Sequence, residues 1–536
     1  MPQIHRNALI LHAHLPWVRH AESLHCPEED WWLEAVTESL IPLLEMLHRL
    51  KREGIPYKTT LAITPTVLAM LRDPLMQQRT EACLDRNLHL AHTEIERGSD
   101  PAKRNLAQWY ADHFHRLHSY FRDRWKRDLV DAIKDLRNSG HLEIPASAAT
   151  HALLPLFLKS PDVLRAQINT GCTVYEGFFG SRPKLFWLPD CAYSPVLEPL
   201  LTAAGIEHIV LDEHAVTYSD HPPEEGIYDA TQTPSGLRVS CRDLESSGYI
   251  FKPEAGLAHD TRYRESPFAL DGDTPVNSLK IQLAANGDLH AAALNTRCMD
   301  SPALYDPGKG SKAAREQSKR LLELLQAHFA RLTTKGITSP LVTTVFGIEL
   351  FGHWRFEGIP FLEKFIRRVA KQDNLELAHL CAKDSPFIWT NTNTVTPIPS
   401  SWGEGGYFET WLAPENAWIY PHLHRRAQQL QRILDALRQN IDGLPDGLAD
   451  HRSRCVSQMT RELMLAQSSD WALFMREPAT RAYATRRFEN HLANFDQLTA
   501  LFASNNESNS SRLLSIEQQN PIFPNLDWKT FSANEA

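Results

Sequence analysis

One stretch, TTVFGIELFGHWRFEG at residues 343–358, constrains the fold more than any other part of the sequence. It begins with β-branched and apolar residues, as a buried strand does, and turns polar and aromatic at Glu349, His353 and Trp354. An apolar strand that ends in a carboxylate, an imidazole and an indole is typical of a (β/α) barrel, because barrel strands carry functional side chains at their ends. A buried strand followed by an ordinary helix gives the same local pattern, so the rest of the chain has to decide.

Short apolar runs alternate with helical patterns along much of the chain. A helix with the 3.6-residue apolar repeat is predicted between the first two runs. Strand–helix–strand units of this length are typical of an α/β fold. The runs with strand character are NALILHAHL (7–15), KTTLAIT (58–64), HLEIPAS (141–147), PKLFWLP (183–189), HIVLDEH (208–214) and LVTTVFG (341–347).

Two long helical stretches interrupt or follow this alternation, and they predict the domain organisation. The predicted parts are a barrel (1–65 and 141–395), an inserted helical subdomain (66–140) and a C-terminal helical domain (396–536). The last of these regains apolar anchors in IFPNLDW (522–528), so its end is expected to dock back. Residues 217–310 are rich in Pro, Gly, Asp and Ser, which predicts long loops and short strands over the site.

The composition excludes several classes of function. A net charge of -9 without a block of Lys or Arg argues against nucleic acid or an anionic membrane as the main partner. The 8 cysteines contain no Cys-x-x-Cys pair and indicate reduced thiols. The N-terminal apolar run is too short for a signal peptide, and no run reaches the roughly 18 apolar residues of a membrane span. We expect a soluble, cytoplasmic protein.

His12 and His14 end the first strand and point to the same face, because alternate residues of a strand share a face. Such a pair can bind a metal, donate hydrogen bonds to sugar hydroxyls, or simply be satisfied at a strand end. Sugar contact is the favoured interpretation, since no further ligands stand at a recognisable spacing.

An acidic residue, Asp190, follows the apolar strand of PKLFWLPDCAYSP (183–195). At the end of a barrel strand it is a candidate nucleophile, general base or ligand. By the local pattern alone, an N-capping role for the next helix is slightly favoured.

Aromatic residues gather among glycines in SSWGEGGYFETW (400–411), where Trp402 and Trp411 are candidates to stack on a sugar. Packing between domains is the alternative. In QSSDW (467–471) a polar run interrupts an apolar helix and offers Asp470 beside an indole. A surface helix face is the alternative there.

Taken together, the motifs resemble those of glycoside hydrolase family 57, and most closely its α-1,4-glucan branching enzymes. They occur in the expected order along the chain from residue 8 to about 530. The matching segments are HAHLPWVRH (12–20), ATHALLP (149–155), WLPDCAY (187–193), ELFGHWRFEG (349–358), SSWGEGGYFETWLAPENAWIYPHLHRRA (400–427) and LMLAQSSDWALFM (463–475).

The resemblance implies a (β/α)7 barrel with an inserted helical subdomain and a C-terminal helical domain that helps to close the cleft. Active members cleave an α-1,4 bond with retention and pass the glucosyl segment to a 6-hydroxyl group, without metal or organic cofactor. The residues that match as substrate contacts are His12, His14, His151, Glu349, His353, Trp402, Trp411 and Asp470.

The two catalytic positions depart from the family pattern. A glutamate nucleophile is replaced by Asp190, and an aspartate acid/base is replaced by Gly347. One methylene less withdraws the carboxylate by roughly 1.5 Å, and a misplacement of about 1 Å can cost on the order of 10²-fold in rate. Loss of a general acid typically costs about 10²–10⁴-fold. The combined deficit is about 10⁴–10⁶, or roughly 5–8 kcal/mol.

The expected function is therefore that of an α-glucan-binding protein related to branching enzymes but catalytically impaired, with an active branching enzyme as a candidate protein partner. The alternative is an active retaining enzyme that uses Asp190 with another acid such as Glu349. A third and weaker hypothesis is a metal-dependent polysaccharide deacetylase, which requires Zn²⁺ at His12 and His14.

Overall fold

The computed structural model describes residues 4–23, 26–252, 257, 260–265, 297–299, 301–337, 340–381, 393–504 and 510–531. Residues 266–296, in the middle of the segment predicted to form loops over the site, lie outside the described residues.

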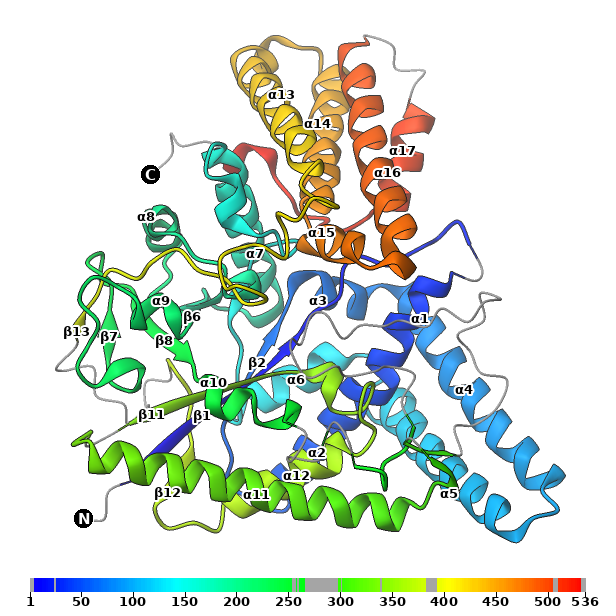
Figure 1. The fold of residues 1–536 in the computed structure, drawn as a ribbon. Helices are drawn as coiled ribbons and strands as arrows, with labels where there is room; N and C mark the ends of the chain where they lie inside the picture. Colours follow the sequence, from blue (N-terminus) through cyan, green and yellow to red (C-terminus); the bar gives the residue numbers. More distant parts are fainter. Residues whose placement is uncertain are drawn as a thin grey trace.

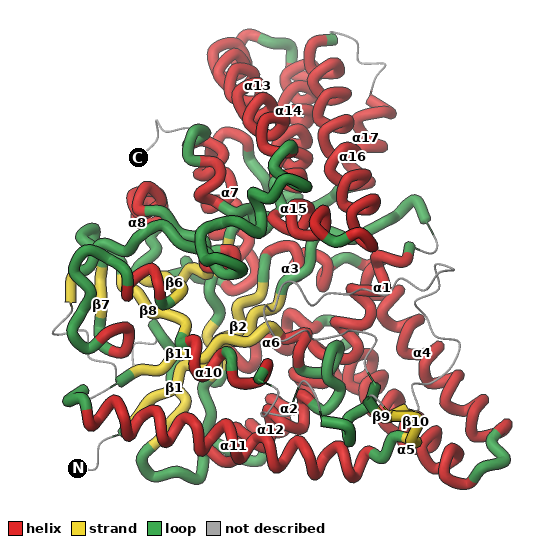
Figure 2. The backbone as a smooth tube through the Cα atoms, viewed as in Figure 1, coloured by secondary structure: helices red, strands yellow, loops and turns green. Residues whose placement is uncertain are grey.

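Parallel strands form a curled sheet at the centre of the molecule (Figures 1 and 2). Its path runs β3-β2-β1-β11-β8-β6-β5-β4. Only two residues separate β3 from β4, and β2 contacts β4, so the path returns to the segment where it began. The predicted α/β barrel is confirmed. The strands are β1 (His5–Ala13), β2 (Thr59–Ile63), β3 (Leu142–Glu143), β4 (Ala146–Ser147), β5 (Leu185–Trp187), β6 (His208–Asp212), β8 (Arg238–Arg242) and β11 (Leu341–Gly347), with β7 (Thr231–Gln232), β12 (Leu375–Leu377) and β13 (Asn393–Thr394) at the margins.

The two faces of the barrel strands carry separate hydrophobic clusters. In β1, Leu9 and Leu11 belong to the large cluster, whereas Ala8 and Ile10 belong to a small one with Val345 of β11. The small cluster takes one residue in two from its strands, as the filled interior of a barrel requires. His12 and Gly347 continue the same alternation at the strand ends and are direct neighbours across the ladder. The interior face of the barrel therefore leads straight into the site.

Helices surround this sheet and follow the strands in the βα order that the sequence predicts. A π-helix at Ala35–Leu40 joins the first two of them. The helices beside the barrel are α1 (Pro27–Glu34), α2 (Ile41–Arg52), α3 (Pro65–Arg72), α6 (Leu129–Asn138), α7 (Pro161–Phe179), α8 (Glu198–Ala203), α9 (His214–Thr217), α10 (Leu244–Ser247), α11 (Pro307–Thr334) and α12 (Gly358–Val369).

Helices α4 (Pro74–Arg97) and α5 (Pro101–His118) pair with each other and extend away from the barrel (Figure 1). Asp73 and Asp100 accept hydrogen bonds from the first backbone N–H groups and so begin the two helices. The pair contributes Tyr110 and Phe114 to a small hydrophobic cluster that also includes Tyr305. Neighbouring α3 and α6 contribute to the large cluster, as α4 also does through Met76 and other residues.

The C-terminal region is helical and stands over one end of the barrel (Figure 1). Short helix α15 connects it to the barrel, because Ser468 forms an isolated β-bridge with Ala152 just before α15 begins. Trp528 of the terminal segment is 3 % exposed, and its 3-10 turn contacts α7. No helix in the described part of the chain is long and apolar enough to cross a membrane. The helices are α13 (Ile419–Asn440), α14 (Asp446–Ala466), α15 (Ser469–Arg476), α16 (Pro478–Ala503) and α17 (Ser510–Gln519).

Candidate active site

A cavity of about 180 Å³ lies at the strand ends, between the barrel and α15. Of the ten residues predicted for the site, nine line this cavity, so segments up to 458 residues apart in the sequence meet here. The nine are His12, His14, His151, Asp190, Gly347, Glu349, His353, Trp402 and Asp470.

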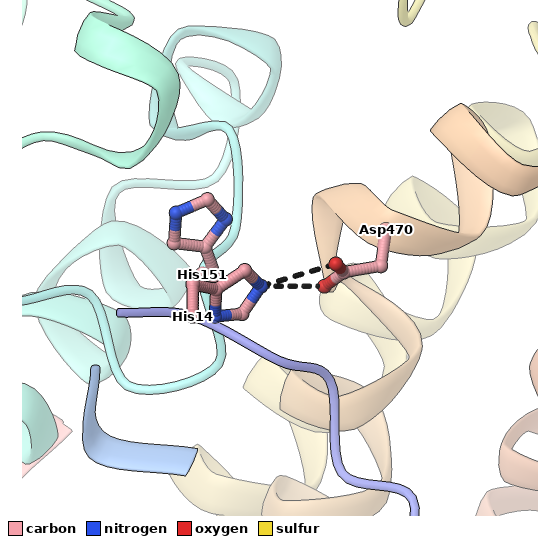
Figure 3. Close-up of side chains that lie close together, drawn as sticks. All are labelled: His14, His151 and Asp470. Carbon is pink, nitrogen blue, oxygen red and sulfur yellow. Dashed lines mark hydrogen bonds and ion pairs between the residues drawn. The ribbon is translucent and has the colours of Figure 1, made fainter. Parts of the chain in front are cut away.

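His14 connects the barrel to the C-terminal helices (Figure 3). Its Nε2 donates to both carboxylate oxygens of Asp470, at 2.9 and 3.1 Å, and its Nδ1 lies 3.0 Å from Oγ1 of Thr64. The hydroxyl of Ser468 also donates to Asp470, at 2.5 Å. Asp470 lies in the first turn of α15. The ring of His14 is held between this carboxylate on one side and the Thr64 hydroxyl on the other, which fixes its orientation.

His151 stacks on His14, with 3.7 Å between the ring centroids and 14° between the ring planes (Figure 3). These two residues and Asp470 place ligand atoms within 4.8 Å of one another. A Zn²⁺ ion would need nitrogen lone pairs converging on it at about 2.0–2.1 Å. Nearly parallel rings 3.7 Å apart cannot both direct an in-plane lone pair at one ion, so this arrangement fits hydrogen bonding better than metal binding.

Asp190 sits in a tight turn at the end of β5, with positive φ angles of 53° at Asp190 and 51° at Cys191. Its backbone carbonyl accepts from the N–H of Trp402 at 2.6 Å. The hydroxyl of Ser469 donates to Oδ2 of Asp190 at 3.1 Å and lies 2.9 Å from Nδ1 of His151, which therefore acts as the donor to Ser469. Main chain and side chain both hold this carboxylate in place, in a left-handed conformation that non-glycine residues rarely adopt.

Burial raises the pKa of Asp190 to about 7. This value is the net result of several influences. The neighbouring charge of Asp470 acts in the same direction as burial, whereas His14 and the hydrogen bond from Ser469 lower the pKa. A carboxyl group with a pKa near neutrality can act as a base or an acid in this pH range.

Gly347 leaves an open position at the end of β11. Its φ and ψ of -68° and 136° are ordinary extended values that any residue can adopt. A Cβ atom at this position would lie 3.1 Å from Oε2 of Glu349, so the Glu349 carboxyl group borders the space that a side chain at 347 would enter. Burial raises the pKa of Glu349 to about 7, against the lowering effects of its own N–H and of His14.

His12 lies on the floor of the cavity and stacks on Trp187, with 4.9 Å between the ring centroids. Burial lowers the pKa of His12 to about 3, with a smaller effect from His14, so the ring is neutral at physiological pH. Among the described residues, Nε2 of His12 and Nε2 of His151 have no hydrogen-bond partner although both are buried. Buried polar atoms of this kind are normally satisfied, and hydroxyl groups of a ligand would satisfy them.

The two tryptophans of the glycine-rich loop have different positions. Trp402 lines the cavity, and the guanidinium of Arg242 lies 4.4 Å from the centre of its ring. Trp411 is 1 % exposed, belongs to the large hydrophobic cluster and does not line the cavity. The loop turns at Gly403, above the ring of Trp411, which is only 3.6 Å from the position of a Cβ there. The structure thus does not bring Trp411 to the ligand, and its predicted contact stays a prediction.

Several cavity residues were missed by the sequence analysis. Ser469 stands next to Asp470 in a motif that drew attention only to the acid. Arg242 ends β8 in the pattern Arg-Asp, so the strand-end rule could have found it. Trp31 is on α1, where its helical spacing resembles that of any core residue, and no signal distinguished it.

The chain matches known proteins over nearly all its length. A model described as glycosyl hydrolase family 57 matches residues 8–250, and one described as 1,4-alpha-glucan branching enzyme, C-terminal, matches residues 422–531. A 1,4-alpha-glucan branching enzyme of Thermococcus kodakarensis is 26 % identical over 91 % of this chain and 72 % of that protein.

Two solved structures have a similar fold. The alpha-amylase AmyC from Thermotoga maritima matches with a TM-score of 0.86 and 30 % identity, over 100 % of both chains. A GH57-type branching enzyme from Pyrococcus horikoshii matches with a TM-score of 0.83 and 24 % identity, over 99 % of this chain and 97 % of that one. At the lower identity, the likeness extends to the fold alone.

Proposed function

The chain belongs to glycosyl hydrolase family 57, and from this premise we propose that it binds α-1,4-glucan chains in the barrel cavity while catalysing little or no branching. The ligand class is supported by the names of two relatives, a 1,4-alpha-glucan branching enzyme and an alpha-amylase. Neutral imidazoles with unpartnered nitrogens, and an indole at the wall, are groups that suit an uncharged polyhydroxyl ligand.

The observation that carries the proposal is the glycine at position 347. The cavity keeps nine predicted residues together, yet the position that matches the family's acid/base has no side chain. The position that matches the nucleophile keeps a carboxylate that is one methylene shorter. A site that keeps its contacts and loses its acid should bind sugar without turning it over by the retaining mechanism.

A second candidate function rests on Glu349. Its carboxyl group borders the space beside Gly347, and its pKa of about 7 allows it to donate a proton near neutral pH. With Asp190 as the partner carboxylate, this pair would give a slow or altered enzyme in place of an inactive one.

Binding is tested with purified protein and maltoheptaose by isothermal titration calorimetry. Trp402→Ala should weaken binding by roughly 2–10-fold, because aromatic stacking contributes on the order of 0.5–1.5 kcal/mol. Trp418→Ala is the matched control, since Trp418 lies outside the cavity and is 38 % exposed. Equal affinity of the Trp402 variant and the control would place the glucan elsewhere and overturn the proposal.

Branching is tested by long incubation of concentrated protein with amylose, followed by a debranching enzyme that releases new side chains. The proposal expects no release above the blank. Release that disappears in Asp190→Ala would establish a working branching enzyme and contradict it.

A further inference from the structure

We propose that His14 stands in the cavity as an imidazolium ion, with a hydrogen on both ring nitrogens, and that Thr64 and Thr66 are the positioning residues that hold it in this form. The inference goes beyond the proposed function, because it concerns the protein with or without glucan. It gives His14 the role of a fixed positive charge, in place of the sugar contact that its motif predicts.

The argument follows the hydrogens along a chain of polar atoms that leads to His14. The chain starts at the backbone carbonyl of Leu15, which lies 2.8 Å from Oγ1 of Thr66. A carbonyl oxygen only accepts, whereas a hydroxyl group has one hydrogen to donate. The hydrogen of Thr66 is therefore given to Leu15.

Thr64 is the next group in the chain. Its Oγ1 lies 3.1 Å from Oγ1 of Thr66, and it has to donate there because the hydrogen of Thr66 is already in use. The same Oγ1 lies 3.0 Å from Nδ1 of His14, so in that contact the ring nitrogen is the donor. The two threonines are 0 % and 1 % exposed, which keeps solvent water out of the chain. Nδ1 of His14 therefore carries a hydrogen.

The second ring nitrogen of His14 faces Asp470. Nε2 lies 2.9 and 3.1 Å from the two carboxylate oxygens (Figure 3). One N–H group shared between two oxygens gives two contacts of similar length, whereas a protonated acid keeps its hydrogen on one oxygen. Oδ2 also accepts from the hydroxyl of Ser468, at 2.5 Å. Asp470 is therefore the ionised acceptor, and Nε2 carries the second hydrogen.

The carboxyl groups around His14 suit a cation at this position. Asp470 of α15, Asp190 at the end of β5 and Glu349 after β11 all line the same cavity as His14. Burial raises the pKa of Asp190 and of Glu349, and the charge of His14 opposes this in both. A charge inside a protein is stable only when it is paired and hydrogen-bonded. His14, whose side chain is 10 % exposed, has both kinds of partner.

The other two imidazoles of the cavity differ from His14 in charge and in partners. Burial lowers the pKa of His12 to about 3 and that of His151 well below its usual value, with a contribution from the charge of His14 in both cases. Among the described residues their Nε2 atoms have no hydrogen-bond partner, whereas both ring nitrogens of His14 are bonded within the protein. For the glucan proposed above, the imidazole hydrogen bonds thus fall to His12 and His151.

The hydroxyl of Thr64 therefore controls a charge beside two carboxyl groups of the cavity. A buried N–H group without an acceptor is costly, so without Thr64 the ring releases the hydrogen of Nδ1 and becomes neutral. Asp190 and Glu349 then lose the positive charge that favours their ionised forms. Neither Thr64 nor Thr66 lines the cavity, so both act through His14.

The test is NMR of the imidazole nitrogens at pH 7, in protein labelled with isotopic nitrogen in its histidines. The His14 signals are assigned through bonds in the unaltered protein and by their loss in His14→Gln. The expected result is the chemical shifts of two protonated nitrogens at His14, whereas a histidine with the ordinary pKa of about 6.5 is mostly neutral at this pH. A His14 ring with only one protonated nitrogen would overturn the inference.

Substitutions of threonine test the positioning role. Thr64→Val removes the acceptor with little change of shape, so the Nδ1 signal should move to that of an unprotonated nitrogen while Nε2 stays protonated. Thr64→Ser keeps a hydroxyl group and should keep both hydrogens. The matched control is Thr59→Val, because Thr59 is buried in β2 and its hydroxyl has no hydrogen-bond partner among the described residues. A His14 ring that stays doubly protonated in Thr64→Val would show that the threonines do not fix the ion.

Titration of the same samples with maltoheptaose keeps the two proposals apart. A doubly protonated His14 in a protein that binds no glucan leaves this inference standing and removes the proposed function. Glucan binding by a protein with a neutral His14 removes only the inference.

Discussion

The cavity has two flanks that differ in how their carboxyl groups are held. The Asp190 flank, made by His151, Asp190, Ser469 and Asp470, has side-chain hydrogen bonds at every member. The Gly347 flank, made by Gly347 and Glu349, has an empty side-chain position beside one half-buried carboxyl group.

This difference shows that the two sequence changes are not equivalent. On the Asp190 flank the chemical group is retained and its reach is shortened, within a network that keeps it in place. On the Gly347 flank the group is absent, and the backbone that carried it has kept an extended geometry suited to any residue. The first flank is held by several hydrogen bonds, whereas on the second a new side chain would require the Glu349 carboxyl group to move by a few tenths of an ångström.

The strongest test of this comparison restores both flanks. Asp190→Glu combined with Gly347→Asp should raise branching by on the order of 10⁴–10⁶-fold, the deficit expected for a misplaced nucleophile and a missing acid. Each single change should gain far less, because both carboxyl groups are needed at about 5–5.5 Å for retention. New side chains released from amylose by a debranching enzyme give the measurement. A folded, glucan-binding double variant without activity would mean that other parts of the site have changed as well.

The pH dependence of the free energy of unfolding compares the two flanks through their carboxyl groups, Asp190 and Glu349. Both folded pKa values, about 7, lie above the unfolded values near 4, so the folded protein binds these protons more tightly. Stability is then lost as the pH rises from about 4 through 7. Asp190→Asn and Glu349→Gln should each raise the free energy of unfolding at pH 8 by about 2–4 kcal/mol and change it little at pH 4. The measurement is the melting temperature of each variant by calorimetry. A constant difference from the wild-type melting temperature across this pH range would refute the raised pKa values.

The hydrogen bond from Ser469 tests the rigidity of the Asp190 flank alone. Ser469→Ala should destabilise the protein by about 1–3 kcal/mol, since it leaves His151 Nδ1 without its acceptor in a buried site. Ser511→Ala, at an exposed position of α17 outside the cavity lining, serves as the control. Denaturant unfolding provides the readout, and an unchanged stability would remove Ser469 from the network.

The smallest expected effect concerns metal. Chelation with EDTA should leave glucan affinity and melting temperature unchanged, because the stacked rings of His14 and His151 do not converge on an ion. A loss of binding on chelation, with Zn²⁺ found by elemental analysis, would support the deacetylase hypothesis instead.

Much of the fold could be predicted because buried parallel strands leave a clear apolar signal, and the ends of those strands carry the polar residues. The i, i+2 spacing of His12 and His14 predicted that both share one face of the first strand, and both line the cavity. Motif order then placed Asp190, Glu349 and Asp470 in one site, although nothing local links them.

The remaining features depend on packing that the sequence does not encode locally. Trp411 and Trp402 have the same glycine-rich context, yet only one of them faces the cavity, because the loop folds back over the other. Trp31 lines the cavity from α1, where its helical spacing does not distinguish it from a core residue. Glu349 borders the space beside Gly347, and only the folded structure shows that its carboxyl group lies next to the missing side chain.

The bond between Ser469 and Asp190 joins residues 279 positions apart, and this has a consequence for the order of events on the ribosome. At synthesis rates of about 5–20 residues per second, the strand that carries Asp190 precedes its C-terminal partner by on the order of 15–60 s. During that interval the carboxylate of Asp190 has neither Ser469 nor Asp470 beside it, and the barrel stays incomplete until β11 has been made. Glucan can therefore meet a complete pocket only after α15 has left the ribosome, and a chain truncated before that helix should emerge without one.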